Sequence, residues 1–193
     1  MATRKEIIVL IILVLLIVLL VKLAEFYKTN VVEADASKFV FEDLHSKYPN
    51  ADIEIMSMRD GYNDAGEKYF EIKTKVTEGA FTPCPERMHI YYNYPVQNFV
   101  SQPTEYITSN CRVCTGGTCT IAFPEEAIIA SHTFAGTEAV HAFVTESEAA
   151  YPSVVEGSDR WTITWDSPVS THYYAVIVGK EGTLVSAEDI QKK

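Results

Sequence analysis

The sequence predicts an α+β protein in which an N-terminal transmembrane helix is followed by an antiparallel sheet with helices packed on one face. Three observations lead to this fold class. A long apolar run lies near the amino terminus, short segments of alternating polar and apolar residues follow it, and segments with helical spacing precede those strands. Because no long parallel crossover separates the strands, the pattern favours α+β over α/β.

The apolar run predicts a membrane anchor over residues 1–28. Ile7–Val21 contains only Ile, Val and Leu and continues to Ala24, giving about 18 residues, enough to span the hydrocarbon layer. No pattern of small residues for signal cleavage follows, so we expect the anchor to stay attached. Arg4 and Lys5 precede the run, which predicts a cytoplasmic amino terminus and an extracytoplasmic remainder. The expected localisation is a single-pass protein of the cell membrane.

The chain is acidic, with a formal net charge of −10. Residues 1–28 carry four of the 16 basic and two of the 26 acidic side chains, which leaves a net charge of −12 on the remainder. Such a charge repels phosphate backbones and therefore argues against nucleic-acid binding. It favours basic partners, cations or simple solubility.

The first unit is expected to begin after a polar tether at residues 29–36. Phe41, Leu44 and Tyr48 lie on one face of a predicted helix, which ends at Pro49-Asn50. Alternating residues then predict strands. These cover Ile53 to Ile55, Phe70 to Val76 and Met88 to Tyr94, with a turn-rich stretch at 60–66 and a stop at Pro95.

The second unit is expected to begin at residue 124. Pro124-Glu125-Glu126 predicts the start of a helix, because proline and acidic residues favour a first turn. Gly136 interrupts the helical pattern, which then continues to Pro152. Strands are predicted at Trp161 to Trp165 and Tyr174 to Val178, with an extension of the sheet at Leu184-Val185.

The order helix, strand, turn, strand occurs twice, at residues 37–94 and 124–186. This repetition suggests an internal duplication. The expected organisation is a first α+β unit at 37–123, including a Cys-rich loop, and a second at 124–193.

The second unit resembles a PepSY domain, a small module of helix and antiparallel sheet. The resemblance is carried by Trp161-Thr162-Ile163-Thr164-Trp165, Tyr173-Tyr174-Ala175-Val176-Ile177-Val178 and Gly179-Lys180-Glu181-Gly182-Thr183-Leu184-Val185. The first unit is similar only in Tyr48-Pro49-Asn50-Ala51 and its Tyr69–Glu78 strand. The resemblance implies non-covalent protein binding, in some members control of a peptidase, and it implies no catalytic residues.

Four cysteines, Cys84, Cys111, Cys114 and Cys119, predict two disulfides in an oxidising exterior. Of the three possible pairings we prefer Cys84 with Cys111 and Cys114 with Cys119. The first link would join the start of the third strand to the clustered loop, and the second would close the Gly-Gly turn. The other pairings remain open.

Two chemical alternatives exist for these cysteines. Four thiolates could hold a tetrahedral zinc ion, although the second CxxC of a zinc ribbon is absent. Cys111 and Cys114 form a CxxC, which is a redox pattern when a thioredoxin-like βαβ unit surrounds it. The sequence around these two cysteines does not predict such a unit. We therefore expect neither a metal nor a cofactor.

Other candidate residues carry weaker signals. Glu138 and His141 share a helix face, with His132 upstream, but no HExxH pattern supports a metal site there. His89 is expected at an ordinary sheet position. Tyr91, Tyr92 and Tyr94 could form an aromatic interaction surface, or simply pack on the sheet.

We expect a non-catalytic binding or regulatory module that engages an envelope or extracellular protein, for example a peptidase. No serine-elbow, P-loop or dinucleotide-binding pattern indicates an enzyme. The alternatives are a pilin-like filament subunit, since an N-terminal apolar helix also builds such subunits, and a zinc- or thiol-dependent enzyme.

Overall fold

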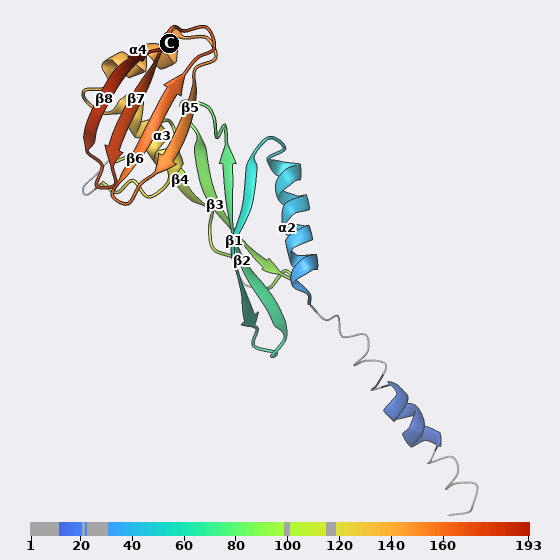
Figure 1. The fold of residues 1–193 in the computed structure, drawn as a ribbon. Coiled ribbons are helices and arrows are strands. Elements are labelled where there is room, and N and C mark those ends of the chain that lie inside the picture. Colours follow the sequence, from blue (N-terminus) through green and yellow to red (C-terminus); the bar gives the residue numbers. More distant parts are fainter. Residues whose placement is uncertain (1–11, 21, 23–30, 99–100, 115–118) are drawn as a thin grey trace, which may run out of the picture.

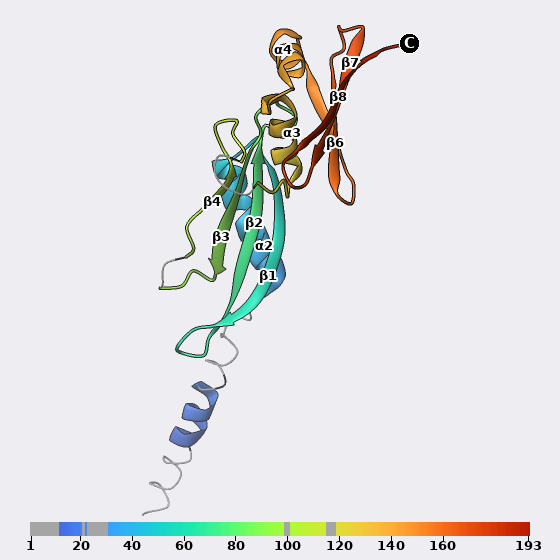
Figure 2. The ribbon, with the colours of Figure 1, turned by 90° about the vertical axis from the view of Figure 1, so that its left-hand side faces the viewer.

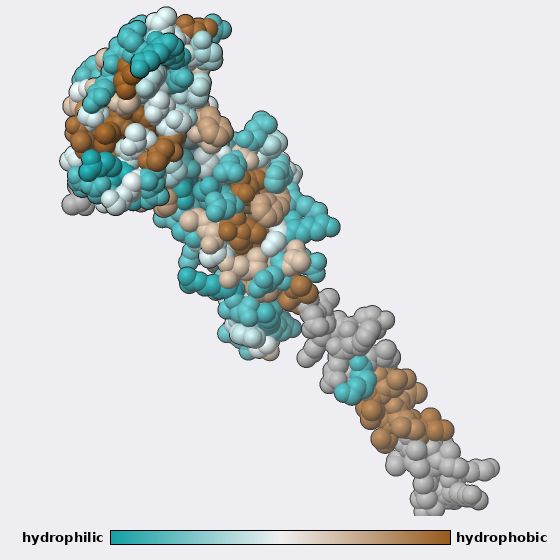
Figure 3. All heavy atoms as spheres, in the orientation of Figure 1, coloured by the Kyte–Doolittle hydropathy of each residue, from teal (hydrophilic) through white to brown (hydrophobic). Residues whose placement is uncertain are grey.

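The computed structural model describes residues 12–20, 22, 31–98, 101–114 and 119–193. Residues 12–20 are helical, and their apolar side chains form a continuous exposed surface (Figure 3). Within the described ranges no helix is long and apolar enough to cross a membrane. The prediction of an N-terminal transmembrane helix is corrected accordingly: the observed fold is α+β without it. Apart from 12–20 and 22, the expected anchor at 1–28 lies outside the described residues.

The first unit is an antiparallel sheet with one helix packed on one of its faces (Figure 1). Its elements are α2 (Glu33–Lys47), β1 (Asp52–Tyr62), β2 (Lys68–Glu78), β3 (Glu86–Tyr94) and β4 (Glu105–Thr108), with strand order β1-β2-β3-β4. The core forms where one stripe of α2 meets alternate residues of the strands. Its buried members are Ala36, Val40, Leu44, Phe70, Ile72, Val76 and Met88.

Helix α2 differs from its prediction in its start and its buried face. It begins at Glu33, inside the segment expected to be a tether, because Ala36 contributes the first buried side chain of the helix. The buried stripe is Ala36, Val40 and Leu44, spaced by four residues, whereas Phe41 and Tyr48 are only half-buried. The sequence analysis placed Phe41 and Tyr48 on the buried face of the helix, whereas the smaller residues Ala36 and Val40 occupy that face together with Leu44.

The second unit repeats this plan with two helices. Its elements are α3 (Pro124–Thr133), α4 (Glu138–Glu146), β5 (Tyr151–Glu156), β6 (Arg160–Asp166), β7 (His172–Gly179) and β8 (Leu184–Gln191), with strand order β5-β6-β7-β8. The predicted start of α3 at Pro124 is confirmed, and Glu126 caps it by accepting hydrogen bonds from the backbone N–H groups of Ala122 and Phe123. Trp161 and Trp165 are buried, and each indole N–H has a partner, Ile121 O and Ser131 Oγ respectively.

Strand β5 was missed by the sequence analysis, which expected helix up to Pro152. Helix α4 ends at Glu146, and Pro152 lies in β5 opposite Trp165. Proline lacks an N–H donor, but β5 is an edge strand, where one side of the backbone needs no partner. Strand β4 was also not predicted, because only four residues form it.

Each unit is therefore a helical layer followed by a four-stranded antiparallel meander. The internal duplication stays a prediction, and helix α4 has no counterpart among the described elements of the first unit. Figure 2 shows α3 beside the end of the first sheet as well as against its own sheet, so α3 lies at the junction of the two units.

Candidate functional site

The four cysteines form the two disulfides that the sequence analysis preferred. Cys84 is bonded to Cys111 and Cys114 to Cys119, and no cysteine is free. The second disulfide packs on the turn at Gly182, whose φ of +76° and lack of a side chain leave room for the Cys119 sulfur. The four-thiolate zinc site is therefore not assembled in this state, and the CxxC of Cys111 and Cys114 is not a disulfide pair.

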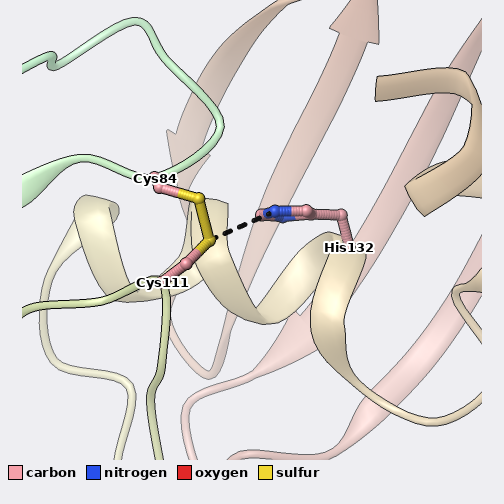
Figure 4. A group of neighbouring side chains, drawn as sticks. All are labelled: Cys84, Cys111 and His132. Carbon is pink, nitrogen blue, oxygen red and sulfur yellow. Dashed lines mark hydrogen bonds between the residues drawn. A yellow bond between two sulfur atoms is a disulfide. The ribbon is translucent and has the colours of Figure 1, made fainter. Parts of the chain in front are cut away.

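The Cys84–Cys111 disulfide contacts a buried histidine that the sequence did not connect with it (Figure 4). His132 on α3 is 3% exposed, and its Nε2 lies 3.6 Å from the Cys111 Sγ. His132 Nδ1 donates to the carbonyl of Ile128 at 3.0 Å, which leaves Nε2 as the unprotonated nitrogen facing the sulfur. Burial lowers the pKa of His132, and the nearby His141 lowers it further.

The helix-face metal hypothesis of Glu138 and His141 is not supported by the described side chains. The Glu138 carboxylate accepts from the backbone N–H of Gly136, in the turn that precedes α4. His141 is exposed and its ring stacks on His132, with 5.9 Å between the centroids. Among the described residues the group with metal-ligating spacing is instead Cys84, Cys111 and His132, whose donor atoms lie within 4.8 Å of one another.

The three tyrosines of the expected interaction surface are half-buried on β3, and they do not share one face of the sheet. The Tyr92 hydroxyl donates to the Asp43 carboxylate of α2 at 2.6 Å. The Tyr94 ring packs on the Phe39 ring of α2, with 5.2 Å between the ring centroids. Tyr91 points the other way and donates to Glu105 of β4. The tyrosines therefore flank the edge of β3 from both sides.

That edge of β3 is open over half of its length. Strand β2 pairs with all of β3, from Glu86 to Tyr94, whereas β4 pairs only with Arg87, Met88 and His89. No described strand pairs with Ile90–Tyr94 on the side facing away from β2. An open strand edge offers backbone N–H and C=O groups to another extended chain.

Two grooves lie along this open edge. The larger groove has a volume of about 760 Å³ and is bounded by α2, the β3 edge and residues 96–97 and 101–104 between β3 and β4. Its apolar lining consists of Phe39, Ile90, Tyr92 and Val96. The smaller, of about 330 Å³, is lined by side chains on the opposite face of the sheet, including Arg59, Glu71, Lys73 and Tyr91. Both include Tyr91, Tyr92, Asn93, Ser101 and Gln102, so they flank the same stretch of backbone.

A buried ion pair connects the first unit to the second. Arg87 on β3 donates through Nη1 to Glu125 Oε2 on α3 at 3.0 Å, and the two side chains are 5% and 7% exposed. The Thr77 hydroxyl donates to the other carboxylate oxygen, and the Arg87 guanidinium lies 3.6 Å from the centre of the Phe123 ring. These contacts satisfy both buried charges.

A chain of hydrogen bonds continues from Arg87 along β3 through His89 and Glu105 to Tyr91. Arg87 donates to His89 Nε2, so the neutral His89 carries its proton on Nδ1 and donates to Glu105 at 3.0 Å. Glu105 also accepts from Tyr91 and lies 3.7 Å from the Lys73 ammonium. Desolvation lowers the pKa of His89, and the charges of Lys73 and Arg87 lower it further, while Glu105 opposes this.

Sequence reasoning did not find this network. Arg87 and His89 alternate with Met88 and Ile90, which is the signal of a strand with one polar face, but a single sequence does not show that α3 covers that face. His89 is 2% exposed and hydrogen-bonded on both ring nitrogens, so the interpretation of an ordinary sheet position understated its role.

Comparison of the chain with protein-family models, with curated proteins and with solved structures finds no match.

Proposed function

We propose that the protein is a non-catalytic, extracytoplasmic binding module that takes up an extended polypeptide segment along the open edge of β3. The observation that carries this proposal is the open edge at Ile90–Tyr94 with a groove on each face of the sheet. A strand added to a sheet projects alternate side chains to opposite faces. Each groove could then receive every second side chain of the bound segment.

The lining of the grooves favours a partner with apolar residues on one face and polar residues on the other. The larger groove presents Phe39, Ile90 and Val96, and the last of these is 78% exposed. The smaller groove presents Arg59, Glu71 and Lys73, which suit polar side chains. The net charge of −10 would steer a basic partner toward the protein.

The location and the kind of partner belong to the same proposal. Two disulfides with no free cysteine fit an oxidising compartment outside the cytoplasm. The resemblance of residues 161–185 to PepSY domains favours an envelope protein, such as a peptidase, as the bound partner. The meander of β5 to β8, preceded by helices, is compatible with that resemblance.

Selection from a library of random, extended peptides tests this function. The full chain, kept oxidised, would be used as bait, and we expect enriched peptides with alternating apolar and polar residues. Val96→Glu should weaken the binding of an enriched peptide by about tenfold or more, because a charge replaces an apolar contact in the larger groove.

Val169→Glu is the matched control, since Val169 is 71% exposed in the second unit, away from the grooves. It should leave the affinity unchanged. Equal losses in the two variants, or no enrichment of any peptide, would contradict the proposed function. Turnover of a substrate by the chain would show that the protein is an enzyme and would also contradict the proposed function.

A further inference from the structure

The Cys84–Cys111 disulfide lies beside a third side chain with a metal-ligating atom, His132. Cys84 is exposed, Cys111 is half-buried and His132, on α3, is buried. The three side chains therefore form a row from the protein surface to the buried side of α3 (Figure 4). Their donor atoms already lie within 4.8 Å of one another. Ligands that each lie about 2.0–2.3 Å from one tetrahedral zinc ion are about 3.5 Å apart, so the two sulfurs, which are now bonded to each other, would separate once that bond is reduced.

His132 is held in the form that a metal requires. Its Nδ1 donates to the Ile128 carbonyl, and this bond fixes the ring orientation and leaves the Nε2 lone pair directed at Cys111 Sγ, 3.6 Å away. Metal-ligating histidines commonly donate their second nitrogen to a backbone carbonyl in this way. Packing against Trp165 and His141 restricts the ring further.

We propose that reduction of the Cys84–Cys111 disulfide creates a zinc site whose protein ligands are Cys84 Sγ, Cys111 Sγ and His132 Nε2. With three protein donors, water occupies the fourth position. Cys114 and Cys119 do not contribute, since they form a separate disulfide on the Gly182 turn and lie outside the group of donors with metal-ligating spacing. This inference does not depend on the proposed peptide-binding function.

The reductant is a dithiol. One of its thiolates attacks the exposed Cys84 Sγ, which forms a mixed disulfide and releases Cys111 as a thiolate. The second thiol of the reductant then attacks the mixed disulfide and releases Cys84. The reductant ends as a disulfide, its two electrons and two protons having passed to the cysteine pair. Zinc then displaces those two protons, because thiolates are the ligands.

Two double variants of the full chain form a matched pair for the test. Cys114→Ser/Cys119→Ser keeps the proposed site and removes the other two thiols, whereas Cys84→Ser/Cys111→Ser does the reverse. Each would be reduced with a phosphine, which adds no competing thiol, and then loaded with zinc and desalted. We expect one zinc per chain in the first variant and none in the second, and none in either variant before reduction.

His132→Gln in the first variant tests the imidazole ligand. We expect a loss of zinc affinity of more than about 100-fold, since removal of a ligand should exceed the effect of removing its supporting contacts. Cobalt in place of zinc should give the thiolate charge-transfer and tetrahedral ligand-field bands with the first variant, and His132→Gln should alter them. Unfolding of the oxidised variant by urea checks that the substitution leaves the chain folded.

Wild-type protein provides a test that needs no variant. After reduction, bound zinc should protect Cys84 and Cys111 from alkylation while Cys114 and Cys119 react, as read by peptide mass. Equal protection of all four cysteines would overturn the proposal in favour of a four-thiolate site. Absence of stoichiometric zinc, including a reduced chain that unfolds and is not refolded by zinc, would overturn it altogether.

Discussion

Arg87 and Glu125 form a buried ion pair that joins β3 of the first unit to α3 of the second, with 3.0 Å between Arg87 Nη1 and Glu125 Oε2. Because both side chains are almost fully buried, neither charge can be solvated if the other is removed. The other ion pairs among the described residues are more exposed. Among the described residues, this is the ion pair that joins the two units.

Replacing Glu125 should destabilise the protein strongly. Glu125→Gln leaves the Arg87 charge buried without a counter-ion, and we expect a loss of about 3 kcal/mol or more in the free energy of unfolding. Urea denaturation measures it. Asp159→Asn is the control, because the Arg160–Asp159 pair is 48% and 65% exposed, so solvent screens it and its loss should lower the stability far less than the loss of Glu125. Similar losses in the two variants would show that the junction does not depend on the buried pair.

The stability of the protein should fall on mild acidification because of His89. The folded-state pKa of His89 lies below the usual histidine value of about 6.5, chiefly through desolvation, with Lys73 and Arg87 adding to the effect. As the pH falls below about 6.5, the unfolded chain binds a proton that the folded chain does not, so stability is lost in the window between that value and the lower folded pKa.

His89→Gln should reduce this pH dependence. The glutamine amide can accept from Arg87 and donate to Glu105 without titrating, so the slope should decrease by up to about 1.4 kcal/mol per pH unit. Urea denaturation at a series of pH values from 7.5 to about 4.5 measures the slope. His132, whose pKa is also lowered by burial, contributes to the remainder. An unchanged slope in the variant would show that His89 does not titrate differently on folding.

The two disulfides should contribute unequally to stability. Cys84 and Cys111 are 27 residues apart and Cys114 and Cys119 are five apart. Loop-closure entropy then predicts losses of about 3.5 and about 2 kcal/mol when each pair is replaced by alanine. Thermal unfolding of the two double variants under oxidising conditions gives the order, and a larger loss for the short loop would be inconsistent with the entropic account.

Tyr92 should matter more for stability than its neighbour Tyr91. Tyr92 donates to Asp43 at 2.6 Å between β3 and α2, and burial together with this carboxylate raises its pKa. Tyr92→Phe keeps the ring and removes that bond, which should lower the free energy of unfolding by about 1.5 kcal/mol. Tyr91→Phe removes a bond to the exposed Glu105 and should have less than half that effect in the same urea titration. The reverse order would mean that α2 is not held through Asp43.

Local patterns in the sequence were sufficient for most elements of the fold. The alternation of Phe70, Ile72 and Val76 identified β2, and Pro124 with its acidic neighbours identified the start of α3. The positions of the cysteines relative to the third strand and the Gly-Gly turn favoured the observed pairing, although the other pairings were left open. The prediction of an N-terminal transmembrane helix was wrong, because no helix of the described residues is long and apolar enough to cross a membrane. Strand β5 was missed because Pro152 was interpreted as the end of a helix rather than as an edge-strand residue.

The candidate site could be anticipated only in part. The tyrosine-rich strand was singled out, because Tyr91, Tyr92 and Tyr94 are unusual in density. What could not be predicted is that β4 would be too short to cover their edge, or that His132 would lie against Cys111. Both are long-range relationships, and they depend on how a loop and a second unit pack rather than on local periodicity.

Amide hydrogen exchange of the full chain, measured with and without a peptide enriched in the selection, tests the peptide-binding account most directly. If the peptide adds a strand to β3, the outward-facing amides within Ile90–Tyr94 should exchange more slowly in the complex, while those of β1, β5 and β8 remain unchanged. Protection confined to one of those other edge strands, or absent from Ile90–Tyr94, would contradict the assignment of the open β3 edge as the binding site.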